Sequence, residues 1–171
     1  VTAMDIGSST GGFTDVLLQG GADHVFAIDS GTNQLAWKLR QDARVTVLEQ
    51  TSARILTPAM IDRPATWVVC DASFIGLSKV LERPLELAER DCRLVALIKP
   101  QFEAGRAAIG KNGVVSDPGV HARVCDDFAA WFAETFPDWQ GHEIVPSPIV
   151  GPQGNKEFLF GARAPDYKSD A

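Results

Sequence analysis

Short apolar runs alternate with amphipathic stretches along this chain, and the alternation predicts strands followed by helices. Several apolar runs are continuous in Val, Ile, Leu and Ala, which is typical of strands buried on both faces. We expect parallel strands over the ranges 3–6, 24–29, 45–49, 67–71 and 93–99. We expect helices over 13–19, 34–40, 77–90 and 117–135, with a short helix near 58–61.

Two further strand-like segments, 142–145 and 157–162, close the pattern as an antiparallel hairpin. The whole alternation favours a mostly parallel α/β sheet with helices over both faces. With 171 residues, the chain is long enough for one domain with a sizeable core. We place this domain at 1–164 and interpret the polar residues 165–171 as a flexible tail.

The first strand ends in a glycine-rich turn, DIGSSTGGF from Asp5 to Phe13, and a helix follows it. A strand, a turn and a helix in this order cradle an adenosine-bearing cofactor at the free N–H groups of the helix. Asp29 ends the second strand about twenty residues later, where an acidic side chain accepts ribose hydroxyls. Asp5 suits a cationic or hydroxyl-rich ligand better than a pyrophosphate. A tight turn that binds nothing is the alternative interpretation.

The same turn also fits the G-x-S-x-G nucleophile elbow of hydrolases, with Ser9 as the nucleophile. That elbow comes after several strands and is followed by an acidic residue and a histidine. Here it stands on the first strand, and the chain has no HGGG-type oxyanion segment. The pattern therefore disfavours hydrolysis.

Three polar residues stand at the ends of predicted strands: Asp71, Lys99 and Glu157. Lys99 follows the run Leu-Val-Ala-Leu-Ile, and a buried lysine is costly unless it is paired. Each residue alone has an ordinary structural interpretation, and Lys99 could simply reach solvent. Together the three are expected to converge at the carboxyl edge of the sheet, beside the cofactor turn. The longest predicted loop, 101–117, begins at this same edge.

The net charge of −6 disfavours binding of nucleic acid by bulk electrostatics, although a local basic face remains possible. Such a face could form a rim around the site, and the alternative is an ordinary solvated surface. The candidate rim residues are Arg106, Lys111, Arg123, Lys156 and Arg163.

Cysteine and histidine usage argues against a metal site. The three cysteines are widely spaced without a CxxC pair, which suits a reducing cytosol rather than a disulfide framework or a zinc site. The three histidines show no metal-ligand spacing. We also find no signal peptide and no apolar run approaching the roughly 20 residues of a membrane span.

Six segments, in the same order over nearly the whole chain, resemble one known family. They are DIGSSTGGFTD (5–15), QLAWKLR (34–40), CDASFI (70–75), LIKPQFE (97–103), GKNGVVSDP (110–118) and SPIVGPQGNKE (147–157). The family is that of the TlyA-type, FtsJ-like methyltransferases, also called hemolysin A. The resemblance implies a Rossmann-like methyltransferase fold with a seven-stranded sheet in the order 3-2-1-4-5-7-6.

The resemblance also implies the activity: S-adenosylmethionine-dependent methylation of a ribose 2′-hydroxyl in ribosomal RNA, in the cytoplasm. The family uses a Lys–Asp–Lys–Glu tetrad, and Asp71, Lys99 and Glu157 match its last three members. The first lysine and a basic S4-like RNA-binding domain normally stand upstream. Since the chain starts with Val1 directly on a strand, we expect a fragment whose binding to ribosomal RNA or a ribosomal subunit needs those parts.

In this interpretation Lys99 takes the hydroxyl proton, Asp71 orients the amine, and Glu157 positions Lys99 or the ribose. The residues expected to bind the cofactor are Asp5, Gly7, Ser8, Ser9, Thr10, Gly11, Gly12, Phe13, Asp29, Thr51, Ser52 and Asp71. Three alternatives stay open: a membrane-active hemolysin, a nicotinamide-dependent oxidoreductase, and a remnant that binds the cofactor without catalysis.

Overall fold

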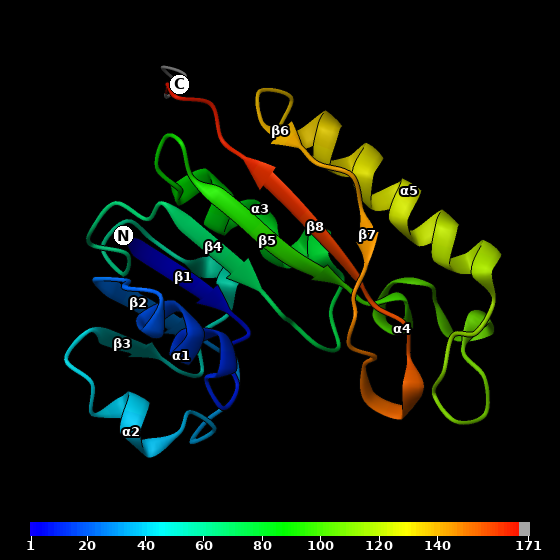
Figure 1. Cartoon of the computed structure of the whole chain (residues 1–171), viewed down its shortest axis with the longest axis horizontal. Helices are drawn as coiled ribbons and strands as arrows, with labels where there is room; N and C mark the ends of the chain where they lie inside the picture. Colours follow the sequence, from blue (N-terminus) through cyan, green and yellow to red (C-terminus); the bar gives the residue numbers. More distant parts are fainter. Residues whose placement is uncertain (168–171) are drawn as a thin grey trace.

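One eight-stranded sheet runs through the computed structural model, which describes residues 1–167 (Figure 1). Its order is β3-β2-β1-β4-β5-β8-β6, and β7 pairs with β8 outside this path. Neighbouring strands are parallel from β3 to β5, and β8 is antiparallel to β5, β6 and β7. The strands are β1 (Thr2–Ile6), β2 (His24–Ile28), β3 (Val45–Leu48), β4 (Trp67–Cys70), β5 (Arg93–Ile98), β6 (Gln140–Gly141), β7 (Val145–Pro146) and β8 (Phe158–Arg163).

Helices cover both faces of this sheet, as the sequence predicts. The α-helices are α1 (Gly12–Gln19), α2 (Trp37–Arg40), α3 (Leu77–Leu87), α4 (Pro100–Glu103) and α5 (Pro118–Thr135). Single turns of 3₁₀-helix form η1 (Ala53–Ile55), η2 (Arg106–Ala108) and η3 (Pro152–Gly154). Asp117 caps α5, because its side chain accepts a hydrogen bond from the Gly119 N–H at 2.8 Å.

The structure corrects several predicted elements. The strand expected at 142–145 is instead split into the short strands β6 and β7, so the seventh strand of the predicted order, 157–162, corresponds to β8. The helix expected near 58–61 is wrong: only one hydrogen-bonded turn forms, closed by the Thr57 carbonyl, and Pro64 soon follows. The predicted loop 101–117 contains α4 and η2. Of the expected tail 165–171, residues 168–171 lie outside the described part.

Two hydrophobic clusters lie on opposite faces of the sheet. The larger joins alternate residues of β1, β2, β4, β5 and β8 to α3 and α5. The smaller joins Ala3, Val25 and Ala27 to α1 and α2. The strands β1 and β2 are therefore held by side chains from both layers, and this fixes their register.

The carboxyl ends of the parallel strands and the start of β8 meet at one edge of the sheet. Asp71 follows β4, Lys99 follows β5, and Glu157 precedes β8. Each of them lies two residues from a strand residue that points away from the larger cluster: Val69, Leu97 and Leu159, respectively. Because side chains alternate along extended chain, the three polar side chains share the face opposite that cluster.

Candidate active site

Lys99 is a buried lysine whose amine is paired at the end of β5. Its side chain is 9% exposed, and its Nζ lies 2.5 Å from Asp71 Oδ1. The two atoms form an ion pair rather than an aligned hydrogen bond, and Lys99 Nζ also donates to Ser73 Oγ at 3.1 Å. The alternative interpretation that Lys99 simply reaches solvent is therefore wrong, since its amine is engaged by two residues that follow β4.

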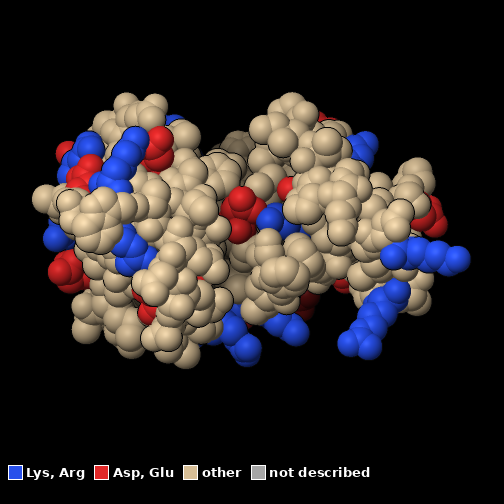
Figure 2. Space-filling view, turned by 90° about the horizontal axis from the view of Figure 1, so that it is seen from below, with Lys and Arg blue, Asp and Glu red and all other residues tan. Residues whose placement is uncertain are grey.

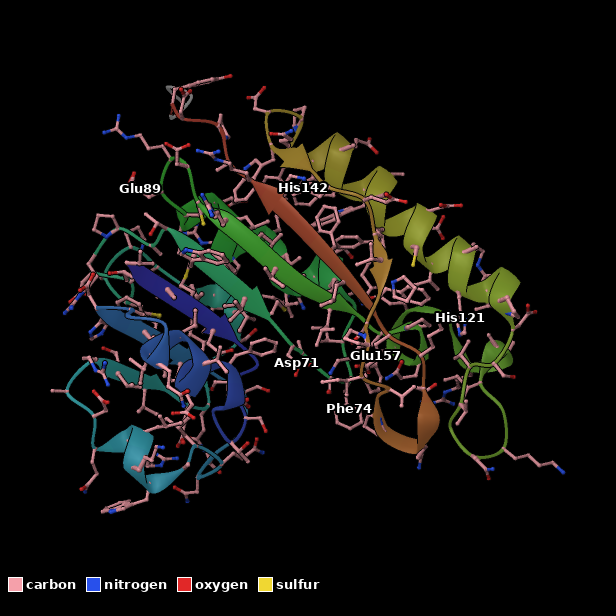
Figure 3. The ribbon with its side chains drawn as sticks, in the orientation of Figure 1. Asp71, Phe74, Glu89, His121, His142 and Glu157 are labelled. Carbon is pink, nitrogen blue, oxygen red and sulfur yellow. The ribbon has the colours of Figure 1, made fainter. Side chains whose placement is uncertain are left out.

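Glu157 lies at the same edge, on the other side of Lys99. The antiparallel ladder ends with Ile98 opposite Phe158, so Lys99 and Glu157 are the next pair in register. Glu157 is 7% exposed, and its Oε2 accepts a hydrogen bond from Gln101 Nε2 at 2.9 Å. Figure 3 shows Asp71 at the end of β4 and Glu157 at the start of β8, on one edge of the sheet. The convergence of strand-end residues agrees with the expectation from sequence.

The short helix α4 connects all of these groups. Gln101 holds Glu157, and Glu103 Oε1 accepts the Leu77 N–H at the start of α3 at 2.7 Å. Burial raises the pKa of Glu103 above its ordinary value. The ring of Phe102 lies 5.0 Å from that of Phe74, measured between centroids. One helical turn thus anchors the β4–α3 loop and the start of β8 to the end of β5. The hydrophobic pattern of the sequence did not predict this helix.

A cavity of about 370 Å³ opens beside these residues, between the loops that follow β1, β2, β3 and β4. Six of the residues expected to bind a cofactor line it: Gly7, Ser9, Asp29, Thr51, Ser52 and Asp71. Ser73 and Phe74 line it too, so the cavity adjoins the Lys99 pair. Figure 2 shows acidic and basic side chains together in the hollow of this face.

Asp29 has the geometry of a ribose acceptor. Its Oδ2 accepts the Ser9 N–H at 2.7 Å and its Oδ1 accepts the Gly31 N–H at 2.8 Å. Two backbone donors fix the carboxylate, and each of its oxygens keeps capacity for a further hydrogen bond. Such a fixed acceptor at the cavity wall suits two vicinal hydroxyls.

Two glycines of the first turn, Gly7 and Gly11, serve close packing within the protein. Gly7 has φ +76°, and a Cβ there would lie 2.7 Å from the Asp71 carbonyl oxygen. Gly11 has φ +101°, and a Cβ there would overlap the Leu39 side chain. The other expected cofactor residues are not part of the cavity lining, and these are Asp5, Ser8, Thr10, Gly11, Gly12 and Phe13.

Asp5 lies beneath the turn and is fully buried. Its Oδ2 accepts the Thr14 hydroxyl at 2.7 Å, whereas its Oδ1 has no hydrogen-bond partner among the described residues. Burial is the main cause that raises the pKa of Asp5 to about 6, opposed by the Thr14 hydrogen bond and aided by the negative charge of Asp71. A buried acceptor without a partner suits a cationic group close to the turn.

Phe74 is a site residue that the hydrophobic pattern could not reveal. Its side chain is 89% exposed at the cavity rim, and its backbone has φ +67°. That conformation is strained for an aromatic residue, and strained residues cluster at functional sites. The sequence feature that could have revealed Phe74 is its position three residues after Asp71, in the segment CDASFI.

The alternative chemistries find less support in the geometry. Ser9 has no histidine beside it: His24 bonds Thr46 Oγ1, His121 bonds the Val115 carbonyl, and His142 follows β6. This arrangement does not favour a hydrolase. In the part of the chain that the structure describes, no helix is both long and apolar enough to cross a membrane.

Comparison with known proteins converges on one family. The model of the FtsJ-like methyltransferases matches residues 1–164. The 16S/23S rRNA (cytidine-2′-O)-methyltransferase TlyA of Mycobacterium tuberculosis H37Rv is 48% identical over 160 residues, which are 94% of this chain and 59% of that protein. The chain thus spans about three fifths of this curated relative.

Solved structures agree with the observed architecture. A Lactococcus lactis protein with a provisional hemolysin name is 43% identical, with a TM-score of 0.90 over 96% of this chain and 78% of that chain. An S-adenosylmethionine-dependent methyltransferase of Mesorhizobium loti has a TM-score of 0.69 over 95% of this chain and 90% of that chain. At 11% identity, the second likeness concerns the fold alone.

Proposed function

Because the chain belongs to the FtsJ-like methyltransferases, we propose that it transfers a methyl group from S-adenosylmethionine to a ribose 2′-hydroxyl of ribosomal RNA. The observation that carries this proposal is the buried Lys99–Asp71 pair beside the 370 Å³ cavity. The rRNA methyltransferase from M. tuberculosis named above supports ribosomal RNA as the substrate class.

The cavity offers the polar groups that this cofactor needs. Asp29 would hold the hydroxyls of the adenosine ribose, and Asp5, buried beneath the turn outside the cavity lining, would attract the cationic methionine end by its charge. Thr51 and Ser52 would line the adenine side. When bound, S-adenosylmethionine supplies an electrophilic methyl group on a sulfonium.

The residues at the sheet edge would prepare the ribose for attack. A 2′-hydroxyl is a weak nucleophile and needs a base aligned with it. Lys99, as the neutral amine, would accept the hydroxyl proton at Nζ, and the ammonium formed would pair with Asp71, while Ser73 helps to fix the position of this atom. Glu157, held by Gln101, would orient the ribose or Lys99. In-line methyl transfer depends on such positioning.

Phe74 would contribute to RNA recognition at the rim. Unstacked RNA bases bind by stacking on exposed aromatic rings. The Phe74 ring is exposed, and its contact with Phe102 supports it from one side. We therefore propose that it stacks on a base near the methylated ribose.

Calorimetric titration with S-adenosylhomocysteine, using NAD as the competitor ligand, tests the cofactor assignment. Saturable binding of S-adenosylhomocysteine alone supports the proposal, and saturable binding of NAD instead overturns it. We expect Asp29→Ala to abolish binding. The matched control is Asp42→Ala, which also removes a carboxylate that accepts a backbone N–H, but at the opposite edge of the sheet.

Methyl transfer itself is tested with ribosomal subunits and S-adenosylmethionine. Methylation of a 2′-hydroxyl protects the adjacent phosphodiester from alkaline cleavage, so primer extension after hydrolysis reveals the site. A chain that binds S-adenosylhomocysteine but leaves every ribose unprotected would contradict the proposed activity.

A further inference from the structure

Two loops beside the candidate active site contain no acidic residue. They are the α4–α5 segment 104–116 and the β7–β8 segment 147–156. All 22 Asp and Glu residues of the chain lie elsewhere, although the net charge is −6. The basic residues of these loops are Arg106, Lys111 and Lys156. The two loops therefore form a positive region on an acidic protein.

The two loops are joined into one surface by Asn155. This residue is 3% exposed, and its Oδ1 accepts the Val115 N–H at 3.0 Å. Its Nδ2 donates to the Gly113 carbonyl at 2.9 Å and to the Pro152 carbonyl at 3.2 Å. Figure 1 shows the loops side by side beyond α4 and the start of β8. A buried amide that bonds both loops fixes their backbones relative to each other.

The charges on these loops are free of ion pairs. Arg106, Lys111 and Lys156 are exposed, and none forms a salt bridge within residues 1–167. Lys156 lies over the Phe158 ring, with its Nζ 5.6 Å from the centroid, and keeps its charge available. Figure 2 shows basic side chains projecting from the right-hand end of this face.

Basic residues at the amino edge of the parallel strands are instead paired with carboxylates. Arg44 pairs with Asp42, Arg63 with Asp62, and Arg163 with Asp91. This location removes Arg163 from the basic rim that the sequence suggested. Arg123 lies on α5 and not on the two loops, so the rim consists of a narrower set than expected.

We propose that Arg106, Lys111 and Lys156, together called the basic arm, bind backbone phosphates of the RNA that enters the active site. Lys156 directly precedes Glu157, and Arg106 lies three residues after the end of α4, the helix whose Gln101 holds Glu157, so the arm adjoins a group that would orient the ribose. Unpaired positive charges on joined loops attract a polyanion, and phosphate contacts set its register without reading sequence. The proposal rests on the proposed RNA methyltransferase function.

Fluorescence anisotropy with a labelled single-stranded RNA tests the basic arm. The test variant is Arg106→Gln/Lys111→Gln/Lys156→Gln, and the matched control is Arg44→Gln/Arg63→Gln/Arg163→Gln. Both variants lose three positive charges, so any effect of net charge is equal in the two. Binding is measured over a series of salt concentrations and with two RNAs of different sequence.

We expect the test variant to bind roughly tenfold to a hundredfold more weakly, equally for both RNAs. The slope of log K against log salt should shrink by about 2, since each lost phosphate contact on single-stranded RNA contributes about 0.7. The control variant should match the wild type. Any of three results would overturn the basic-arm proposal. These are equal losses of RNA affinity in both variants, an unchanged affinity of the test variant, and a wild type that binds no RNA.

A failure of the basic-arm proposal can be distinguished from a failure of the proposed function. S-adenosylhomocysteine binding does not involve the arm, so it should be identical in all three proteins. If the cofactor binds and ribose is methylated while the arm variant binds RNA normally, only the basic arm fails.

Discussion

Lys99 Nζ lies 2.5 Å from Asp71 Oδ1, although 28 positions separate the two residues in the chain. The parallel register of β4 and β5 sets Cys70 opposite Ala96, so Asp71 and Lys99 follow their strands on the same face, with Lys99 two residues farther along. Fewer than one tenth of the Lys99 side chain is exposed, so the pair is desolvated on the lysine side. The position of the amine is therefore a property of the sheet and not of a mobile loop.

Lys99→Met retains the length of the side chain and removes the amine. We expect methyl transfer to ribosomal RNA to fall at least about a hundredfold, which is the scale of a lost general base. Binding of S-adenosylhomocysteine should persist, because Lys99 is not part of the cavity lining. Initial rates of methyl transfer and calorimetric titration with S-adenosylhomocysteine measure the two effects. Lys79→Met, on the exposed face of α3, is the control. Transfer at the wild-type rate would remove Lys99 from the role of base.

Asp5 makes the stability of the protein depend on pH. Its pKa rises from 3.8 to about 6 on folding, so the folded state binds a proton more tightly than the unfolded state. The free energy of unfolding therefore falls as pH rises through this window, by up to roughly 3 kcal/mol once Asp5 is ionised.

Asp5→Asn removes this cost and can still accept the Thr14 hydroxyl. We expect the variant to be more stable than the wild type by about 1–3 kcal/mol near pH 8, with a much smaller difference near pH 4.5. Urea denaturation at both pH values measures the difference in the free energy of unfolding. Asp126→Asn, at an exposed position, is the control. An equal difference at both pH values would mean that ionisation of Asp5 is not the cause.

Gly7 and Gly12 stand in the same turn and should respond oppositely to alanine. Gly7→Ala places a Cβ 2.7 Å from the Asp71 carbonyl at φ +76°, and should destabilise the protein by at least about 2 kcal/mol. A Cβ on Gly12 meets no atom within 4 Å, so Gly12→Ala at the start of α1 should stabilise by up to about 1 kcal/mol. Chemical denaturation distinguishes them, and similar effects from both would contradict the packing argument.

Gln101→Met removes the hydrogen bond to Glu157 with little change in volume. We expect methyl transfer to slow roughly tenfold or more, because a buried carboxylate loses its donor. Gln19→Met is a matched control, since Gln19 Nε2 donates to Asp15 at the same 2.9 Å on an exposed helix face. In a Glu157→Gln background the Gln101 substitution should have no further effect. Additive losses would show that Gln101 does not act through Glu157.

The strand pattern was sufficient to predict most of the sheet and the three polar residues at its edge. Continuous apolar runs mark parallel strands, and the carboxyl ends of such strands meet wherever the helices lie. Helix α4 was missed because one turn of helix is too short for a hydrophobic period to show. The conformation of Phe74 was also hidden, since a positive φ imposed by tertiary context leaves no periodic signal.

The split between β6 and β7 was missed for a related reason. Two-residue strands are too short to show alternation, and here they are held by pairing with β8. The packing role of Gly11 was also hidden, because the Leu39 side chain that occupies the space of its Cβ comes from a distant part of the chain. Sequence spacing predicts where a turn lies, whereas the atoms that a glycine accommodates depend on elements distant in the chain.

The two-residue spacing of Asp71 from Val69, Lys99 from Leu97 and Glu157 from Leu159 links the chemistry to the pleat of the sheet. Inserting or deleting a single residue within β4, β5 or β8 would turn the polar side chain at that strand's end to the opposite face. Length changes in the 104–116 loop lie outside this constraint. Over evolutionary time, the loops of such a protein are free to diverge in length, whereas indels within these three strands would be eliminated.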